Sequence, residues 1–168
     1  MSLVLSSPVL VASFTGQLAP SGNSNITGNV NIIHQVIKSI AVSSTSPGID
    51  GVYSDTRIVA TGTPDAMDLT PLTGPVGAAL TTAKWLGYLL ENLSTTAGEI
   101  LTVGGGTNGI IAAENTDQTI GPGAVKLWFD PKGGKTVTGG STDIFQVKAA
   151  AGTAVSYKVT HFFRSTTG

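Results

Sequence analysis

The stretch AVKLWFDPKGGKTVTGGSTDIFQVKAAAGTAVSYKVTHFF, residues 124–163, decides the fold class. Its apolar segments are short, and they end at Gly, Pro, Asn or Asp, which is the pattern of strands joined by turns. The segments recur at intervals of about ten residues, and this spacing is typical of a sandwich, jelly roll or barrel. The stretch therefore predicts an all-β protein.

The same pattern of short apolar segments and turn residues continues towards the N-terminus. A helix competes with a strand over residues 83–93. Gly87 would cost a helix about 1 kcal/mol in mid-segment, and the aromatic residues of this segment favour a strand. We therefore expect further strands over residues 30–42, 52–61, 65–69, 83–93 and 99–105.

The N-terminal residues differ from the rest of the chain. Leu3–Leu5 and Val9–Phe14 are apolar, whereas residues 16–29 are polar and without periodicity, as in a linker. We predict an extended N-terminal arm and linker over residues 1–29. Residues 30–168 are predicted to form one antiparallel β-sandwich body of the jelly-roll kind.

Composition narrows the classes of function. The 168 residues contain no cysteine, so disulfides and thiolate metal sites are excluded. The formal net charge of −1 provides no long-range field to attract nucleic acid. No apolar run reaches the ~18–20 residues of a membrane helix. Charged residues make up 11%, against roughly 25% in an average domain, which suits packing against copies of the chain or a partner.

Two glycine-rich stretches raise the question of a nucleotide site. In FDPKGGKTVTGG, a phosphate-binding loop would need glycine where Phe129 stands and a helix after Thr136. Both are missing, so this stretch is predicted to be a Pro/Gly turn between two strands. Gly104–Gly106 has no basic residue nearby and no strand–turn–helix unit, and it is predicted to be a strand end.

The titratable residues show no sequence pattern typical of a catalytic or metal site. His34 and His161 fall inside predicted strands, where a lone histidine is more often packed or solvated than catalytic. The two close carboxylate pairs are Asp50 with Asp55 and Asp65 with Asp68. They suit turns, with a weak surface Ca²⁺ site as the alternative. We predict no catalytic residue, no metal site, no cofactor and no small-molecule substrate.

Trp128 is the aromatic residue whose place matters most for function. If the odd-numbered residues of 125–129 face the core, Trp128 and Lys126 face outward, and an outward tryptophan would anchor an interface. The alternative is that both faces of the sheet are covered, which would put Trp128 in a second core layer. The sequence leaves both arrangements open.

Three stretches carry a resemblance to a known family. VYSDTRIVATGTPDAMDLTPLTGPVGAALT (52–81) resembles its Tyr-Ser-Asp-Thr-Arg and Asp-Leu-Asp-Leu pattern, and LLENLSTTAGEILTVGGGTNG (89–109) resembles its Thr-Val-Gly-Gly segment. PGAVKLWFDPKGGKTVTGGSTDIFQVKAAAGTAVSYKVTHF (122–162) resembles its closing strands around Asp-Pro. Over about residues 50–163, the chain therefore resembles a family of small bacteriophage virion structural proteins that are like capsid decoration or cement proteins.

The resemblance implies a virion component and brings no catalytic residue with it. The closing segment departs from the family pattern, because Lys158 stands where Asp is usual and Phe162–Arg164 replaces a small glycine-containing end. The N-terminal arm lies outside the resemblance.

From these features we expect a non-enzymatic virion protein, a capsid decoration or cement protein, assembled in the host cytoplasm. It would form a homo-oligomer, with a trimer favoured, and bind the major capsid protein or other virion proteins partly by adding its arm to a sheet edge. The alternative is a tail- or fibre-associated module that recognises a host glycan or protein through Tyr53, Trp85 and Trp128. The predicted partner-binding residues are Leu3, Val4, Leu5, Val9, Leu10, Val11, Phe14 and Trp128.

Overall fold

The computed structural model describes residues 9–18, 30–74, 77–112, 119–150 and 152–167, with the backbone alone for residues 9–18 and 30–39. This part of the chain contains strands and no helix, and its strands pair antiparallel. The strands are β1 (Val9–Leu18), β2 (Val30–Ser39), β3 (Gly51–Val59), β4 (Asp65–Asp68), β5 (Lys84–Asn92), β6 (Leu101–Val103), β7 (Val125–Phe129), β8 (Lys135–Thr136), β9 (Ile144–Ala149) and β10 (Val155–Arg164).

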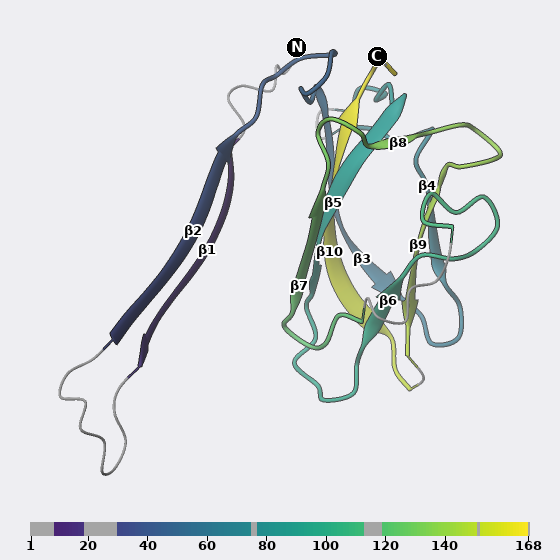
Figure 1. Ribbon diagram of the computed structural model, residues 1–168. Helices are drawn as coiled ribbons and strands as arrows, with labels where there is room; N and C mark the ends of the chain where they lie inside the picture. The colour runs from purple at the N-terminus through teal and green to yellow at the C-terminus, as the bar shows by residue number, and fades with distance from the viewer. Residues whose placement is uncertain (1–8, 19–29, 75–76, 113–118, 151, 168) are drawn as a thin grey trace, which may run out of the picture.

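The body of the protein is a sandwich of two sheets (Figure 1). The larger, five-stranded sheet has the order β3-β10-β5-β7, with the short β8 paired to the start of β5. The smaller sheet has the order β4-β9-β6, and Ile120 adds a bridge to Leu101 on β6. The predicted all-β antiparallel sandwich is confirmed.

The chain winds back and forth between the two sheets. It changes sheet at every step from β3 to β10 except from β7 to β8, which both belong to the larger sheet. This winding is that of a jelly roll, as the sequence predicted. It places the first and last strands of the body, β3 and β10, side by side in the larger sheet.

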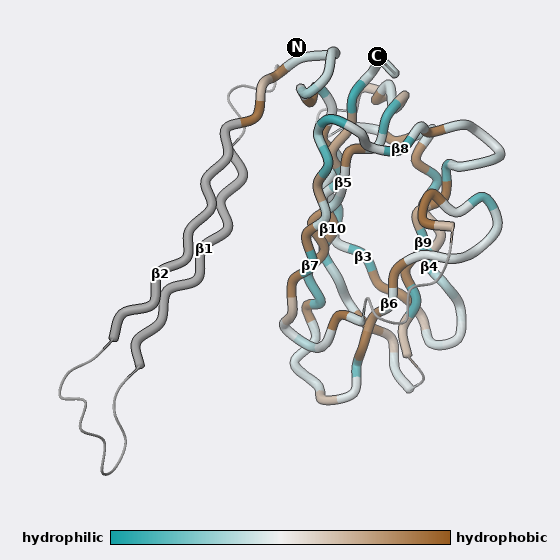
Figure 2. Tube along the Cα trace, viewed as in Figure 1, coloured by the Kyte–Doolittle hydropathy of each residue, from teal (hydrophilic) through white to brown (hydrophobic). Residues whose placement is uncertain are grey.

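Aromatic rings hold the two sheets together at the centre of the core. The ring centroids of Trp85 and Tyr88 on β5 lie 5.7 Å and 5.2 Å from that of Phe145 on β9. All three side chains are buried. Because aromatic rings bury large apolar areas and pack well in offset or tilted pairs, this cluster joins β5 to β9 across the sandwich. Figure 2 shows apolar residues along the strands of both sheets.

A smaller apolar cluster lies on the outer face of the five-stranded sheet, which is the face turned away from the smaller sheet. Its members are Ile40, Ile49, Val52, Leu86, Phe129 and Phe162. Ile40 and Ile49 belong to the connector between β2 and β3, where the Ile49 amide donates a hydrogen bond to the Ala41 carbonyl (3.0 Å). The connector therefore covers one end of the outer face.

Gly87 has a structural reason to sit inside β5. The register with β10 shifts between Phe162 and Phe163, and Leu86 is the extra residue of the resulting bulge. The φ angle of Gly87 is 151°, and a Cβ atom there would lie 2.1 Å from the carbonyl oxygen of Trp128. Only glycine fits this close approach, and the predicted strand over residues 83–93 is confirmed as β5.

β1 and β2 form a two-stranded sheet of their own, which we call the hairpin. It stands apart from the body on the side of the five-stranded sheet (Figure 1). The sequence analysis placed residues 1–29 in an arm and residues 30–42 in the body. In the structure, β2 instead pairs with β1, so each segment satisfies the backbone hydrogen bonds of the other. The sheets of the body begin with β3.

Candidate partner-binding surfaces

Large apolar side chains are exposed on the outer face of the five-stranded sheet. Ile58 on β3 is 67% exposed, Val125 on β7 is 59% exposed and Leu93, just after β5, is 40% exposed. The half-buried Leu89 and Leu127 lie next to them on the same face. We call these five residues the outer patch.

The strand register brings the outer patch together. Ile58 stands opposite Ser156 on β10, and the Ser156 carbonyl accepts a hydrogen bond from the Leu93 amide (3.0 Å). Leu89 stands opposite Leu127 across the β5–β7 pair. Because alternate residues of a strand share a face, the outer patch runs from β3 across the sheet to β7.

Charge on this outer face is low and balanced. The exposed Lys158 and Glu91 stand directly opposite each other on β10 and β5. Nearby, the hydroxyls of Ser54 and Thr160 share a hydrogen bond of 2.9 Å. A partner that packs here would meet two opposite charges that sum to zero, and the long Lys158 and Glu91 side chains can keep their charged ends in water at the edge of the contact.

The hairpin register sorts the residues of β1 and β2 into two faces. Alternate positions belong to the same face, and one face gathers most of the apolar residues. The apolar positions on that face, which we call the hairpin strip, are Leu10, Ala12, Phe14, Leu18, Val30, Ile32 and Val36. The sequences of β1 and β2 include a single formally charged residue, Lys38, which stands opposite Leu10 and so shares the face of the strip. A two-stranded sheet alone is marginally stable in water, so the hairpin would be stabilised by covering the strip.

The predicted partner-binding residues of the arm fall in two places. Residues 3–5 lie outside the described residues. The other four lie on β1, where the register puts Leu10 and Phe14 in the hairpin strip and Val9 and Val11 on the opposite face.

Trp128 lies on the inner face of the sheet rather than outward. Its ring centroid is 5.0 Å from that of the buried Trp85, and it stands opposite Tyr88 in the register. The outward face of β7 instead carries Val125. The outward orientation considered for Trp128 is therefore corrected, because the indole gains more contact by packing on the aromatic cluster.

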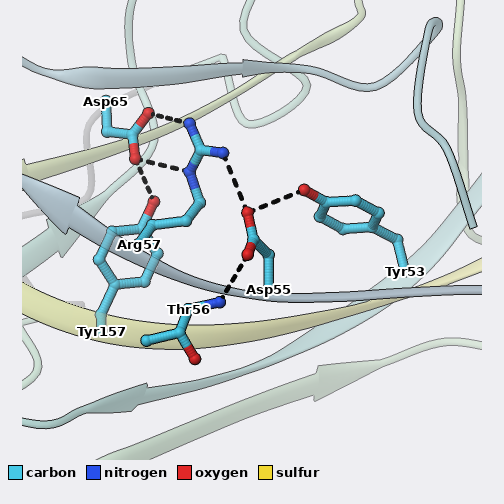
Figure 3. Close-up of polar contacts among 6 residues, drawn as sticks. All are labelled: Tyr53, Asp55, Thr56, Arg57, Asp65 and Tyr157. Carbon is cyan, nitrogen blue, oxygen red and sulfur yellow. Dashed lines mark hydrogen bonds and ion pairs between the residues drawn. The ribbon is translucent and has the colours of Figure 1, made fainter. Parts of the chain in front are cut away.

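The Tyr-Ser-Asp-Thr-Arg motif forms a polar network at the rim of the sandwich (Figure 3). Arg57 donates two hydrogen bonds, both 2.7 Å, to the two carboxylate oxygens of Asp65 on β4. Asp65 also accepts a hydrogen bond from the Tyr157 hydroxyl (2.8 Å), and Asp55 accepts one from the Tyr53 hydroxyl (3.0 Å). Because β3 and β4 belong to different sheets, this network ties the sheets together. The motif thus has a structural role.

Hydrogen bonding fixes the charge states in this network. Burial alone would raise the pKa of Asp65, but hydrogen bonds from Arg57 and Tyr157 outweigh it and hold that pKa below its ordinary value. The hydrogen bonds to Asp65 raise the pKa of Arg57, and burial followed by Asp65 raises the pKa of Tyr157. These three groups therefore keep one protonation state near neutral pH, unlike a general acid or base.

The free edge of β3 is partly closed to an added strand. β3 is the end strand of the larger sheet. The Thr56 amide donates its hydrogen bond to the carboxylate of Asp55 (2.8 Å), so it is already engaged. Charged residues on an edge strand limit pairing with another chain. The outer patch is therefore a more open surface for a partner than this edge.

His161 is a packed core residue. It is fully buried, and its Nδ1 accepts a hydrogen bond from Nε1 of Trp85 (3.0 Å). Its ring meets Phe145 edge-on with centroids 4.6 Å apart. Burial lowers the pKa of His161 to about 3, so the imidazole is neutral at neutral pH. His34 lies on β2, opposite Phe14.

The two glycine-rich stretches form turns. After β7, Asp130 accepts backbone hydrogen bonds from Lys132 (3.2 Å) and Gly133 (2.8 Å), and Gly134 has a φ of 55°. Gly104–Gly106 follows β6, with positive φ at each residue. Neither stretch leads into a helix, so neither offers a helix N-terminus to a phosphate group.

The remaining carboxylates of the predicted pairs serve local structure. Asp50 accepts a hydrogen bond from the Ser165 amide (2.8 Å), and Asp68 accepts one from the Thr70 amide (2.9 Å). Within the described ranges, no group of three or more His, Cys, Asp or Glu residues is placed to hold a metal ion.

Small cavities open on the described part of the body, among them the following two. One of about 130 Å³ is lined by Trp85, Tyr88, Ile111, Trp128 and Lys135. The other, of about 260 Å³, is lined by Gly62, Thr63, Pro64, Lys148 and Ala149. Both are smaller than the roughly 300–1,000 Å³ of typical ligand pockets.

Sequence reasoning did not single out the exposed members of the outer patch. Alternation along β3 groups Ile58 with Ser54 and Thr56, opposite a face that carries Asp55 and Arg57. A charged face is ordinarily assigned to solvent, which would bury Ile58. The alternation therefore showed which residues of β3 share a face. Which of the two faces is buried depended on partner residues far away in the sequence.

Comparisons with known proteins add no assignment, since no family model, curated protein or solved structure matches this chain. In the part of the chain that the structure describes, no helix has the length and apolar character needed to cross a membrane.

Proposed function

We propose that this protein is a non-enzymatic structural component of a bacteriophage virion, a capsid decoration or cement protein. The observation that carries the proposal is the hairpin, which stands apart from a compact jelly-roll body (Figure 1). A projecting segment with an apolar face and almost no charge is suited to bind a neighbouring protein. The three phage-like sequence stretches support the placement in a virion.

In this proposal the body and the hairpin have different roles in attachment. The body is held together by its aromatic core and by the Arg57–Asp65 link, so it acts as a rigid unit. The hairpin supplies the contact to a shell protein or to another copy of the chain. Weak contacts repeated over a regular shell add up through avidity, so a single hairpin need not bind tightly.

Removal of the hairpin tests this function. A chain that lacks residues 1–39 keeps Ile40, which packs on the body, and we expect it to lose its place on purified particles. The measurement is occupancy per particle after mixing particles that lack the protein with the truncated or the full-length chain. Unchanged occupancy of the truncated chain would refute attachment through the hairpin.

A pair of point variants gives a matched control. Val36→Lys puts a charge at a position of the hairpin strip, and Ile37→Lys puts the same charge on the opposite face. We expect Val36→Lys to lower occupancy at least several-fold more than Ile37→Lys does. Equal losses would mean that the strip is not the binding face.

The alternative function, a tail or fibre module, draws less support from the structure. It would require Tyr53, Trp85 and Trp128 on an exposed surface. Trp85 is fully buried and the other two are half-buried on the inner face of the five-stranded sheet. These three residues therefore form no open aromatic platform for a glycan.

A further inference from the structure

We propose that the outer patch of one copy is covered by the hairpin of a second copy, which packs face to face through the hairpin strip. This inference rests on the self-association that is part of the proposed function. It goes further by naming the two surfaces that meet. Because both surfaces belong to the same chain, each copy can give its hairpin to the next.

The outer patch exposes large apolar side chains that would be stabilised by contact with another apolar surface. Its most exposed members, Ile58 and Val125, are 67% and 59% exposed, and the charged Lys158 and Glu91 stand opposite each other on the same face. Soluble monomers rarely leave large contiguous apolar patches exposed. The other end of the same face is already covered by apolar residues of the connector. The connector thus forms an apolar layer over one end of this face and leaves the outer patch uncovered.

The hairpin matches this surface in chemistry and in length. Its strip is made of apolar positions, and the single formal charge in β1 and β2, Lys38, stands opposite Leu10 on the same face, at the end nearest the connector. β1 and β2 have 10 residues each, as does β10 in the sheet to be covered. β2 also ends one residue before Ile40, so the hairpin continues directly from the connector that covers the rest of this face. Face-to-face packing of two sheets is the ordinary way to bury such surfaces.

The hairpin of the same chain does not provide this cover. β1 and β2 pair with each other and stand apart from the body (Figure 1). An identical hairpin from a second copy can take the position instead, because exchange of identical elements is a low-cost route to oligomers.

The area of the contact is adequate for an oligomer. With ~3.3 Å per residue and ~4.8 Å between strands, the hairpin covers a footprint of about 33 Å by 10 Å. Reciprocal exchange between two copies, with two hairpin contacts at one two-fold interface, would then bury roughly 1,300 Å² in total. Stable interfaces bury about 1,200–2,000 Å².

Cysteine cross-linking tests the contact directly, because the chain has no cysteine of its own. One chain carries Ala12→Cys in the hairpin strip, and a second, separately tagged chain carries Val125→Cys or Ile58→Cys in the outer patch. We expect mixed chains under oxidising conditions to form disulfide-linked heterodimers with at least one of the two patch positions. Val11→Cys, on the opposite hairpin face, is the matched control and should cross-link at least tenfold less.

Three outcomes would overturn the inference. These are no cross-link at either patch position, equal cross-linking of Val11→Cys, or a disulfide within one chain that carries both Ala12→Cys and Val125→Cys and stays monomeric. The last result would show that each hairpin covers its own sheet.

The charge variant Ile58→Lys/Val125→Lys provides an independent measurement. We expect it to sediment as a smaller species than the wild type, whereas Thr107→Lys, at an exposed position after β6, should not. An unchanged sedimentation coefficient would again contradict the inference.

The inference and the proposed function can fail separately. If wild-type chains occupy particles but the cysteine variants do not cross-link, the hairpin binds another virion protein and the inference is wrong. If the cysteine variants cross-link as expected but wild-type chains never bind particles, the copies exchange hairpins and the proposed virion function is wrong.

Discussion

Arg57 and Asp65 form the polar contact that most directly links the two sheets of the body. Their side chains are 29% and 13% exposed, so the bidentate pair is partly shielded from water. Asp65→Asn would remove the charge and misalign the two hydrogen bonds. We expect a loss of about 1–3 kcal/mol in the free energy of unfolding, measured by urea denaturation.

Asp55→Asn is the matched control for this prediction. Asp55 contacts the same guanidinium at 3.3 Å but is 40% exposed, and ion pairs at such sites contribute less than about 1 kcal/mol. If Asp55→Asn were as destabilising as Asp65→Asn, the link between the sheets would not be the source of the effect.

His161 makes the stability of the body depend on pH. Its pKa is lowered from 6.5 to about 3 in the folded protein, so below pH 6.5 the unfolded chain binds a proton that the folded chain does not. The stability from this group is therefore complete above pH 6.5 and is lost as the pH falls towards 3. Between pH 7 and pH 5 the loss amounts to about 2 kcal/mol.

His161→Phe is the variant that isolates this dependence. It leaves Nε1 of Trp85 without its acceptor and so lowers stability at every pH, but it removes the titration. His34 is present in both proteins and cancels in the comparison. The wild type should lose more stability than His161→Phe between pH 7 and pH 5; equal losses in thermal or urea unfolding would contradict the burial of a neutral imidazole.

At the scale of single residues, the sequence could not reveal which way β3 and β7 face. Along β3 the charged Asp55 and Arg57 face inward, because Arg57 binds Asp65 on β4 and also contacts Asp55. Asp65 is held in turn by Tyr157 on β10. These partners lie on other strands, and local alternation cannot show them. Trp128 turns inward for the same kind of reason, since the buried Trp85 on β5 provides its contact.

Among the elements, the hairpin is separable from the body. β1 and β2 pair with each other and with neither sheet of the body. A chain that lacks residues 1–39 should therefore keep a cooperative thermal transition within a few degrees of the full-length protein. Loss of the β-sheet circular dichroism signal in the truncated chain would show that the hairpin belongs to the folded core.

Strand positions were readable from the sequence because each strand ends at a turn residue. The segments predicted over residues 52–61 and 83–93 correspond to β3 and β5. The pairing of β2 was not readable. β2 is rich in β-branched residues and would suit a sheet of the body, and the sequence contains no local signal that selects β1 as its partner.

For the whole molecule, the jelly-roll winding explains how distant parts of the sequence meet. It brings β3 next to β10, and thereby Arg57 next to Tyr157 in the register. It also leaves the outer face of the five-stranded sheet covered by the connector at one end, with the outer patch open beside it. The fold class followed from strand spacing, whereas these surfaces required the three-dimensional arrangement.

The central claim, that this protein decorates a virion shell in many copies, is tested most directly by its copy number in purified particles. Quantitative mass spectrometry of gradient-purified virions should find the chain at a level comparable to that of the major shell protein. Its absence from the particles, or a handful of copies as expected for a tail component, would contradict the claim.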